Sequence, residues 1–441
     1  MSTLATQAEL MALAERLYPI CRSITGSGLR QTLRILAESI PLELVETPSG
    51  TAVFDWEVPL EWNIESAHLL DPDGRRVVDF AEHNLHIVNY SEPVSATLTL
   101  DELRPRLHVS DRDPGWIPYK TSYYSRNWGF CLRARDLQDF GPGNYRAEVA
   151  STLQPGSLTY GELLLPGASK REVLVFTHAC HPSLANDNVS GLVVTAALAQ
   201  WLAGRSRRYS WRFVFAPGTI GSLCWLRRNE PNLGLIEHGL VLGLLGDPAP
   251  WTYKMSRRGD AQVDTLVPYV LRELDPRTRV IDFEPYGYDE RQLCSPGFNL
   301  PVGRLGRSVN DGYPQYHTSA DDLSLVSPDA VGRSLDACKA IAEVIEGDRR
   351  YVNLLSKGEP RLGKRGLYGA MGGNSPASSE RAMLWVLNQS DGQRSLVDIA
   401  RRSGMGFANI QSAALALQGA GLLSDQSTGQ FTGQSTGSSE Q

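Results

Sequence analysis

Apolar strands and helices alternate along the chain from about residue 145 to residue 345, and this alternation limits the fold more than any other feature. The strand candidates are 161–165, 173–177, 212–216, 240–245 and 279–283, and the helix candidates are 191–202, 222–228, 261–274 and 330–345. Strands that alternate with helices of this length predict an α/β fold, with a mostly parallel sheet flanked by helices. Reactive side chains in such folds lie at the carboxyl ends of the strands.

Two predicted helices precede this region, and a segment with a different sequence pattern lies between them and the α/β region. Apolar residues recur at helical spacing in residues 5–18 and again at Leu29, Leu33 and Leu36. From residue 48 to residue 115, short apolar or alternating runs broken by Pro and Gly predict a small all-β domain. Because helices precede this β domain and the α/β pattern follows it, we expect 48–115 to be an insertion into an α/β domain formed by 1–47 and 116–352.

The C-terminal region has a third pattern. Short helices are predicted at 381–388, 396–402 and 407–418, and a β-like stretch follows from Gly421. This order is typical of a winged-helix domain, which we predict at 353–425. The segment 426–441 consists mostly of Ser, Thr, Gly and Gln and is expected to be disordered.

The charge of the chain argues against a dedicated nucleic-acid binder. There are 43 Lys and Arg residues against 49 Asp and Glu residues, which gives a net charge of −6. Within residues 381–425, three acidic side chains offset most of the basic side chains. The remaining positive charge is too small for tight electrostatic binding to DNA phosphates. Those basic residues are Arg381, Arg394, Arg401 and Arg402. We therefore interpret the winged helix as a protein-interaction or dimerisation element, which would allow a homo-oligomer.

The sequence also predicts where the protein works. The N-terminus lacks the basic and apolar regions of a secretion signal, and no window offers about 18 uninterrupted apolar residues. The six cysteines are dispersed and form no CxxC pair, as expected for reduced thiols. We expect a cytoplasmic protein with no membrane partner.

Two of the eight histidines, His178 and His181, share one short segment with Asp187. The segment starts where the apolar strand 173–176 ends and finishes where a helix begins, so it forms a strand-to-helix turn. Imidazole nitrogens and a carboxylate oxygen together suit Zn²⁺ or a similar ion. The alternative is that the histidines close the strand and Asp187 caps the helix. Two histidines and an acid in one turn favour a metal site over that alternative.

Two other segments carry candidate ligands. His317 precedes the last helix of the α/β region, where Asp321 or Asp322 could orient its second nitrogen or cap that helix. Asp247 follows an apolar strand, where an acid can bind metal or form a turn. Three separate strand ends therefore each supply a His or an Asp.

These segments resemble the zinc-dependent aminopeptidases of the bacterial leucyl aminopeptidase and glutaminyl cyclase superfamily. Ala185-Asn-Asp-Asn-Val-Ser-Gly191 is similar to their Asn-Asp-Asp-Gly-Ser-Gly segment, and the resemblance implies that Asp187 is the metal-bridging acid. His317-Thr-Ser-Ala-Asp321 resembles their His-Thr-x-x-Asp motif, which implies a ligand role for His317. The resemblance also implies Asp247 as a ligand and favours His178 by its position at the strand end, while His181 stays an alternative.

A narrower resemblance covers nearly the whole chain. The similar group has an aminopeptidase-like domain, a β insertion and a winged helix, and it is often labelled as polysaccharide-biosynthesis proteins. The segments that carry the resemblance are Cys21–Gly26, Tyr123–Cys131, Cys180–Ser183, Asp289–Gln292 and Cys294–Gly297. The resemblance says much less about the substrate than about the fold.

The chain departs from the zinc aminopeptidases at one place. A Glu-Glu pair of those enzymes supplies the general base and a metal ligand, and here Gly218 and Thr219 stand in its place. The departure favours one zinc ion over two and requires a base from elsewhere. Glu290 and Asp289 are the best replacements by position, unless they form a solvated surface turn.

Other side chains are candidates for contact with a substrate. Arg291 could bind a carboxylate or phosphate in a bidentate manner. The aromatic residues could instead be core, and Arg22 could instead belong to a helix cap. These candidates are Arg291, Tyr123, Tyr124, Trp128 and Arg22.

The residues and the resemblance together predict a metal-dependent hydrolase of the aminopeptidase type, acting on a peptide-like or amide-containing small substrate. A different interpretation is a binding or scaffold protein in a biosynthetic pathway that keeps the aminopeptidase fold without its turnover. A third, suggested by the winged helix, is a transcription factor, against which the charge balance argues.

Overall fold

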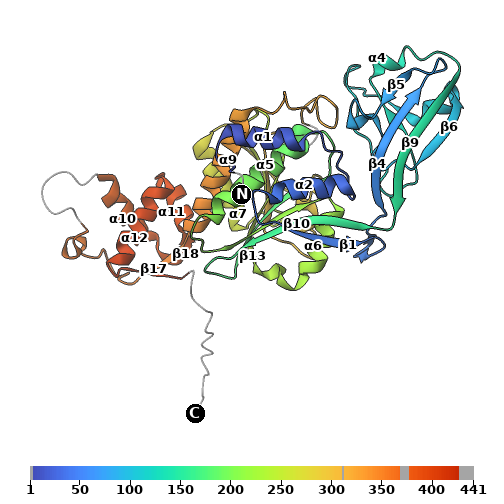
Figure 1. Cartoon of the computed structure of the whole chain (residues 1–441). Coiled ribbons are helices and arrows are strands. Elements are labelled where there is room, and N and C mark those ends of the chain that lie inside the picture. The colour runs from blue at the N-terminus through green and yellow to red at the C-terminus, as the bar shows by residue number, and fades with distance from the viewer. Residues whose placement is uncertain (1–2, 310–311, 368–376, 427–441) are drawn as a thin grey trace. The chain divides into compact units, whose positions relative to one another are not determined.

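The computed structural model describes residues 3–309, 312–367 and 377–426, and the chain divides into two compact units (Figure 1). The first unit is Met1–Lys339, which we call the core unit, and the second is Ala340–Gln441, the C-terminal unit. Within the described ranges, no helix has both the length and the apolar composition needed to cross a membrane.

An eight-stranded sheet forms the centre of the core unit, with the order β1-β10-β12-β11-β13-β16-β14-β15. The strands β12, β11, β13 and β16 run parallel, whereas β10 and β14 join this parallel group in antiparallel directions. The predicted mostly parallel α/β fold is thereby confirmed. The bounds are β1 Glu43–Pro48, β10 Ser157–Leu165, β11 Glu172–His178, β12 Ser210–Ala216, β13 Ile236–Leu242, β14 Thr252–Lys254, β15 Arg279–Ile281 and β16 Val302–Gly306.

Helices cover both faces of this sheet (Figure 1). Every residue of β11 is buried, as expected for a parallel strand between two helical layers. The helix α5 follows β11 and is itself almost wholly buried, which explains its nearly continuous apolar sequence. The helices are α1 Gln7–Leu17, α2 Ser27–Ala37, α5 Ser190–Ala203, α6 Ile220–Asn229, α7 Gln262–Leu274, α8 Glu290–Leu293 and α9 Pro328–Gly347.

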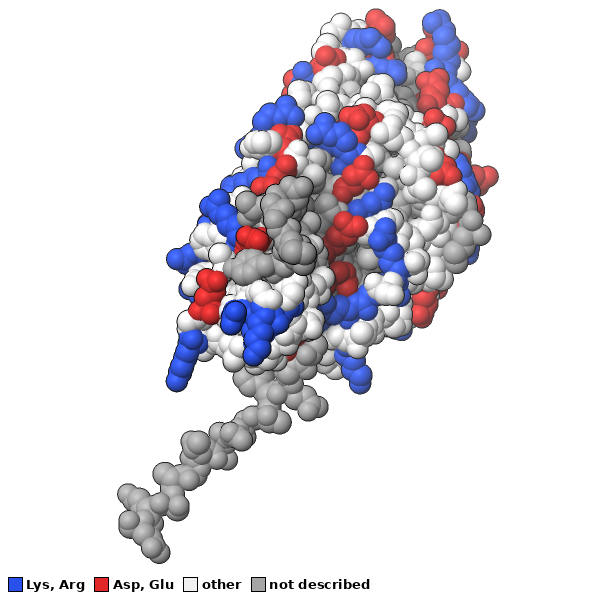
Figure 2. All heavy atoms as spheres, turned by 90° about the vertical axis from the view of Figure 1, so that its left-hand side faces the viewer, with Lys and Arg blue, Asp and Glu red and all other residues white. Residues whose placement is uncertain are grey.

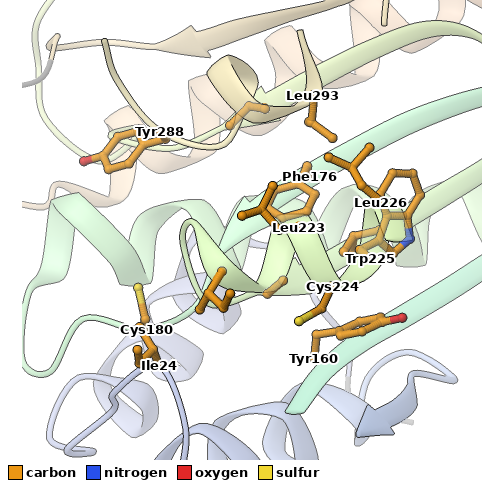
Figure 3. Close-up of a cluster of buried hydrophobic side chains, with 14 of the residues drawn as sticks. Ile24, Tyr160, Phe176, Cys180, Leu223, Cys224, Trp225, Leu226, Tyr288 and Leu293 are labelled. Atoms are coloured by element: carbon orange, nitrogen blue, oxygen red, sulfur yellow. The ribbon is translucent and has the colours of Figure 1, made fainter. Parts of the chain in front are cut away.

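One buried apolar cluster joins β11 to α6 and α8 (Figure 3). The cluster includes Phe176 of β11, Leu223 and Trp225 of α6, and Leu293 of α8. Burial of these side chains stabilises the fold by roughly 1.5–3 kcal/mol for each large residue. It also fixes the carboxyl end of β11, which carries His178, relative to the segment before α8.

A second sheet, antiparallel and with the order β5-β4-β9-β6, forms the inserted β domain. Its bounds are β4 Glu61–Leu70, β5 Arg76–Asp79, β6 Val94–Thr99 and β9 Asn144–Gln154. The predicted insertion at 48–115 leaves out β9, although β9 is an inner strand that pairs with both β4 and β6. The alternating burial of β9 is that of a strand with one face on the core of this sheet, rather than of the buried strands that follow it.

Short elements complete the core unit. They include the hairpin β2 Ala52–Val53 and β3 Trp56–Glu57, and the parallel pair β7 Leu107–His108 and β8 Phe130–Cys131. Single helical turns are α3 Leu100–Leu103 and α4 Ala134–Leu137, with 3₁₀ or π turns at Asn84–His86, Arg104–Arg106, Ala185–Val189 and Glu230–Leu235.

The C-terminal unit is a winged helix, as predicted. Its elements are β17 Arg350–Asn353, a 3₁₀ turn at Leu362–Arg365, α10 Ala377–Gln389, β18 Asp391–Ser395, α11 Leu396–Ser403, α12 Phe407–Gly419 and β19 Leu423–Asp425. The middle strand of its sheet is β17, which begins before the predicted boundary at residue 353. Almost all of the predicted disordered tail, residues 427–441, lies outside the described residues.

Candidate metal centre

His178 and Asp187 lie at the two ends of the turn that joins β11 to α5. His178 is the last residue of β11, and Asp187 lies in the π-helical turn Ala185–Val189 directly before α5. Both side chains are fully buried, whereas the side chain of His181, between them in sequence, is 12% exposed. The site therefore occupies the carboxyl end of a central parallel strand, as expected for this fold class.

Three imidazoles surround the Asp187 carboxylate. His178 Nε2 lies 3.6 Å from Asp187 Oδ1, and His181 Nε2 lies 3.5 Å from Asp187 Oδ2. His317 Nε2 approaches Asp187 Oδ2 to 2.8 Å from a distant part of the chain. The ligand atoms of His178, His181 and Asp187 all lie within 4.8 Å of one another, which is compatible with a single metal ion.

The protonation and bonding of these groups fit a metal ion. Burial by itself raises the pKa of Asp187, but His181, His178 and His317 outweigh burial and hold that pKa below its usual range. Burial lowers the pKa of His181 well below its usual value and so favours the neutral imidazole that metals bind. Although the imidazoles lie close, neither carboxylate oxygen of Asp187 accepts a well-aligned hydrogen bond within the described residues, and His178 Nδ1 has no hydrogen-bond partner there. Buried polar atoms without a hydrogen-bond partner are costly unless a cation or a water molecule contacts them.

Asp321 holds the backbone of the turn in place. Its two oxygens accept the amide N–H groups of Asn186, at 2.6 Å, and of Asp187, at 3.0 Å. The hydroxyl of Tyr313 donates to the same carboxylate at 2.9 Å. Burial and the nearby Asp187 raise the pKa of Asp321 to about 7. Asp321 thus positions Asp187, rather than orienting His317 or capping the last helix as predicted.

Asp247, the predicted third acid, is not part of this cluster. Its Oδ2 accepts from the side-chain amide of Asn186 at 2.8 Å, and its Oδ1 accepts from the amide N–H of Ala249 at 2.8 Å. The strand β13 ends at Leu242, earlier than predicted, so Asp247 belongs to the following loop and supports the turn from outside the cluster. The structure therefore does not support the prediction that Asp247 is a ligand.

Asp289 lies beside His178, where the resemblance implies a glutamate side chain. A Cβ atom at Gly218 would lie 3.2 Å from Asp289 Oδ2 and 3.5 Å from the Cβ of His178. The Asp289 side chain is fully buried, and neither of its oxygens is hydrogen-bonded within the described residues. Burial raises the pKa of Asp289 to about 6, with His178 and Ser222 acting in the opposite direction. An acid from α8's N-terminus thus occupies space that the glycine leaves open.

Glu290, the other predicted base, is engaged elsewhere. Its Oε1 lies 2.7 Å from Lys254 Nζ in a buried ion pair, and its Oε2 accepts from the amide N–H of Tyr288 at 3.1 Å. Consecutive residues at the start of a helix point about 100° apart, so Asp289 and Glu290 face different surroundings. The geometry supports Asp289 as the candidate base and not Glu290.

Aromatic rings border the cluster on two sides. Tyr119 lies with its ring centroid 5.1 Å from that of His181 and 5.2 Å from that of His317. Tyr288 stacks on His178 with centroids 4.4 Å apart. Neither tyrosine is predicted from the sequence to border the cluster, because nothing in their local sequence indicates which distant rings they contact.

The three aromatic residues predicted to contact substrate lie at different positions relative to the cluster. Tyr123 donates to or accepts from Tyr119 at 2.7 Å, so it lies just behind the ring that faces the cluster. Tyr124 is exposed and contacts Trp56, with ring centroids 5.3 Å apart. Trp128 packs on Phe130 in the core of the β domain, which agrees with its alternative interpretation as core.

The two predicted arginines also differ. Arg22 is fully buried and donates from Nε to the backbone oxygen of His181 at 2.9 Å and to Asn188 Oδ1 at 3.0 Å. It therefore holds the turn that carries the candidate ligands, which does not support a contact with substrate. Arg291 has a buried Nε with no hydrogen-bond partner in the described chain. The predicted binding of a carboxylate or phosphate by Arg291 therefore stays a prediction.

Cys180 contacts the cluster as a thiol. Its Sγ lies 3.1 Å from His181 Nδ1, and burial raises the pKa of the thiol. A neutral buried thiol is a poor metal ligand and an inert group. Cys180 thus lies beside the His181 ring as a neutral thiol.

Comparisons with known proteins agree with this fold. Residues 11–348 match the family described as "Domain of unknown function (DUF4910)", and residues 349–425 match a winged helix-turn-helix. A protein of Clostridium acetobutylicum, provisionally named a polysaccharide biosynthesis protein with aminopeptidase-like domain, is 48% identical over 419 residues. That similarity covers 95% of this chain and 96% of the relative.

Solved structures show the same fold. A crystal structure of a protein from Clostridium acetobutylicum, provisionally called a peptidase, is 46% identical and has a TM-score of 0.89, over 95% of this chain and 96% of that chain. A zinc aminopeptidase from Bacillus subtilis has a TM-score of 0.55 at 12% identity, over 78% of this chain and 95% of that chain. This chain therefore belongs to the family of the domain of unknown function DUF4910, with an aminopeptidase-like fold followed by a winged helix-turn-helix.

Proposed function

We propose that the protein is a zinc-dependent hydrolase that cleaves a peptide or amide bond in a small substrate. The observation that carries this proposal is the buried cluster of His178, His181 and Asp187 with the Asp289 carboxylate beside it. Two imidazoles and one carboxylate form the three-ligand set of a catalytic zinc site, which leaves a position for water or substrate. His317 lies at the more exposed side of the cluster and is a fourth candidate.

Zinc bound there would polarise an amide carbonyl and lower the pKa of a water molecule. The chain's own groups supply the remaining functions. Asp321 holds the amides of Asn186 and Asp187, and Arg22 holds the His181 carbonyl, so the ligands are preorganised. Asp289 is the group placed to accept the proton that the attacking water loses and to return it to the leaving nitrogen.

The donor set supports one zinc ion rather than two. Gly218 and Thr219 offer no carboxylate where the resemblance implies one, and Asp247 is engaged with Asn186 and Ala249. We expect about one equivalent of zinc in the full chain purified without chelators or a polyhistidine tag, measured by elemental analysis. Hydrolysis of a panel of aminoacyl amides and small peptides then tests turnover.

Two other results would contradict this proposal in different ways. Two equivalents of zinc would show that a second site exists despite Gly218 and Thr219. No zinc, even after addition of the metal, would favour the alternative of a binding or scaffold protein with an aminopeptidase-like fold.

We propose further that the winged helix contacts protein rather than DNA. The helix α12 occupies the position of a recognition helix, and its sequence Phe407–Gly419 contains no Lys or Arg. Its exposed residues are small, polar or apolar, and Leu415 is 56% exposed. Acidic and basic side chains are intermixed on the face of the molecule shown in Figure 2.

Duplex DNA is therefore expected to bind weakly, with a shallow dependence on salt. A protein with many phosphate contacts loses about 10³–10⁵-fold in affinity between 50 and 200 mM salt, and we expect less than about a tenfold loss here. Fluorescence anisotropy with labelled duplexes measures this dependence. A steep slope would contradict the assignment to protein contacts.

A further inference from the structure

A small cavity opens at one edge of the eight-stranded sheet, over the strands β16, β14 and β15. Its volume is about 190 Å³, less than the space that a complete drug-sized ligand needs. The pairing register places Arg304 opposite Lys254, and Lys254 opposite Ile281, so these side chains share one face of the sheet. All three line the cavity, and Arg279 stands at its exposed rim.

The lining of this cavity carries three basic side chains, Lys254, Arg279 and Arg304, and one acidic side chain, the exposed Glu284. Lys254 and Arg304 are only 5% and 7% exposed, although like charges on opposed strand positions are unfavourable. Glu290 neutralises Lys254, whose ammonium also donates to the backbone oxygens of Glu284 and Tyr286. Arg304 makes no ion pair with any described residue, and its Nε and Nη2 are buried without a hydrogen-bond partner. Among the described residues, this buried guanidinium is thus left without an acidic partner.

Tyr288 separates this charge from the metal-binding cluster. The guanidinium carbon of Arg304 lies 4.4 Å from the centroid of the Tyr288 ring, and His178 stacks on the same ring at 4.4 Å. A single ring face does not hold both groups at that distance, so Arg304 and His178 lie on opposite faces. The cavity is therefore distinct from the metal-binding cluster, one aromatic ring away from it.

We propose that this cavity binds the oxyanion group, carboxylate or phosphate, of a small ligand. An unpaired guanidinium presents a planar fork of donors that matches both groups. A buried charge without a partner is strongly unfavourable, and an anion in the cavity would neutralise it. The site extends beyond the proposed hydrolase and does not depend on its metal.

The experiment is calorimetric titration of the full chain with sodium phosphate and, separately, with sodium acetate, at ionic strength held constant with chloride. We expect one equivalent of at least one oxyanion to bind, and Arg304→Gln to weaken that binding at least tenfold. Phosphate alone would identify a phosphate group as the ligand's anion, and acetate alone a carboxylate. Equal affinity in wild type and Arg304→Gln, or no binding of either anion to wild type, would overturn the proposal.

Three further variants keep the result interpretable. Arg279→Gln, at the exposed rim, should fold normally and weaken binding by a smaller factor, so it decides the matter if Arg304→Gln does not fold. Arg75→Gln changes the same charge on the distant turn before β5, at a residue whose side chain is 75% exposed, and should bind like wild type. Asp187→Asn should also bind like wild type. Loss of oxyanion binding in Asp187→Asn would show that the anion binds to a metal ion, and would overturn the proposal that it binds in the cavity.

Discussion

Replacing Asp187 by asparagine is expected to remove the bound zinc and to lower amide hydrolysis by about 10³-fold, since a metal supplies several kcal/mol to the transition state. Asparagine keeps the size of the side chain but removes the negative charge that the imidazoles of His178, His181 and His317 surround. Elemental analysis of the purified variant and a rate assay with the same amide substrate measure the two effects.

Asp136→Asn is the matched control for this substitution. Asp136 lies in α4 with a side chain that is 39% exposed, and it forms ion pairs with the neighbouring Arg133 and Arg135. The control should keep its zinc and its rate. A full equivalent of zinc in Asp187→Asn would contradict the assignment of Asp187 as a ligand.

Replacing Asp289 by asparagine is expected to leave zinc in place and to lower kcat by about 10²–10⁴-fold, the usual contribution of a general base. The base must be ionised to accept a proton, so activity should fall as the pH drops below the pKa of Asp289. Burial raises that pKa to about 6, so kcat/KM of the wild type should decline in the acid range below it. The variant should lack this decline in its residual activity.

Glu290→Gln separates this prediction from the other predicted base. Removing the partner of Lys254 should destabilise the fold, because it leaves a buried positive charge, but the acid decline of kcat/KM should persist. If Glu290→Gln instead lost turnover and the pH dependence while Asp289→Asn kept both, Glu290 would be the base and the geometric assignment would be wrong.

Much of the candidate metal-binding cluster could be predicted because it is local in sequence. His178, His181 and Asp187 lie within one turn, so a strand end and a helix start were enough to bring them together. His317 came from its motif, and the structure places it against Asp187. The direction of a side chain was harder to predict, as Asp247 and Glu290 show. The direction of a side chain depends on the residue at which a strand ends and on the rotation of a short helix about its axis. Sequence patterns specify neither.

Three strands of the sheet, β1, β14 and β16, were not predicted from the sequence patterns, because strand pairing depends on distant segments. The strand β14 has only three residues, and β16 contains Arg304 between Gly303 and Leu305, so neither shows an apolar run or a clear alternation. The strand β9 does alternate, but the alternation does not say which of two sheets it joins. Strand pairing is a contact between distant segments, and local composition specifies it weakly.

The sequence by itself determined the fold class, the winged helix and the turn that holds the candidate ligands, because periodicity and short motifs act over a few residues. Only the tertiary structure decided that Asp289 occupies the space above Gly218, that Arg22 braces the turn, and that Arg304 is left without an acid. These three relations join residues far apart in the chain. Their distances and burial are set by how whole elements pack, and that packing also determines which charges are paired.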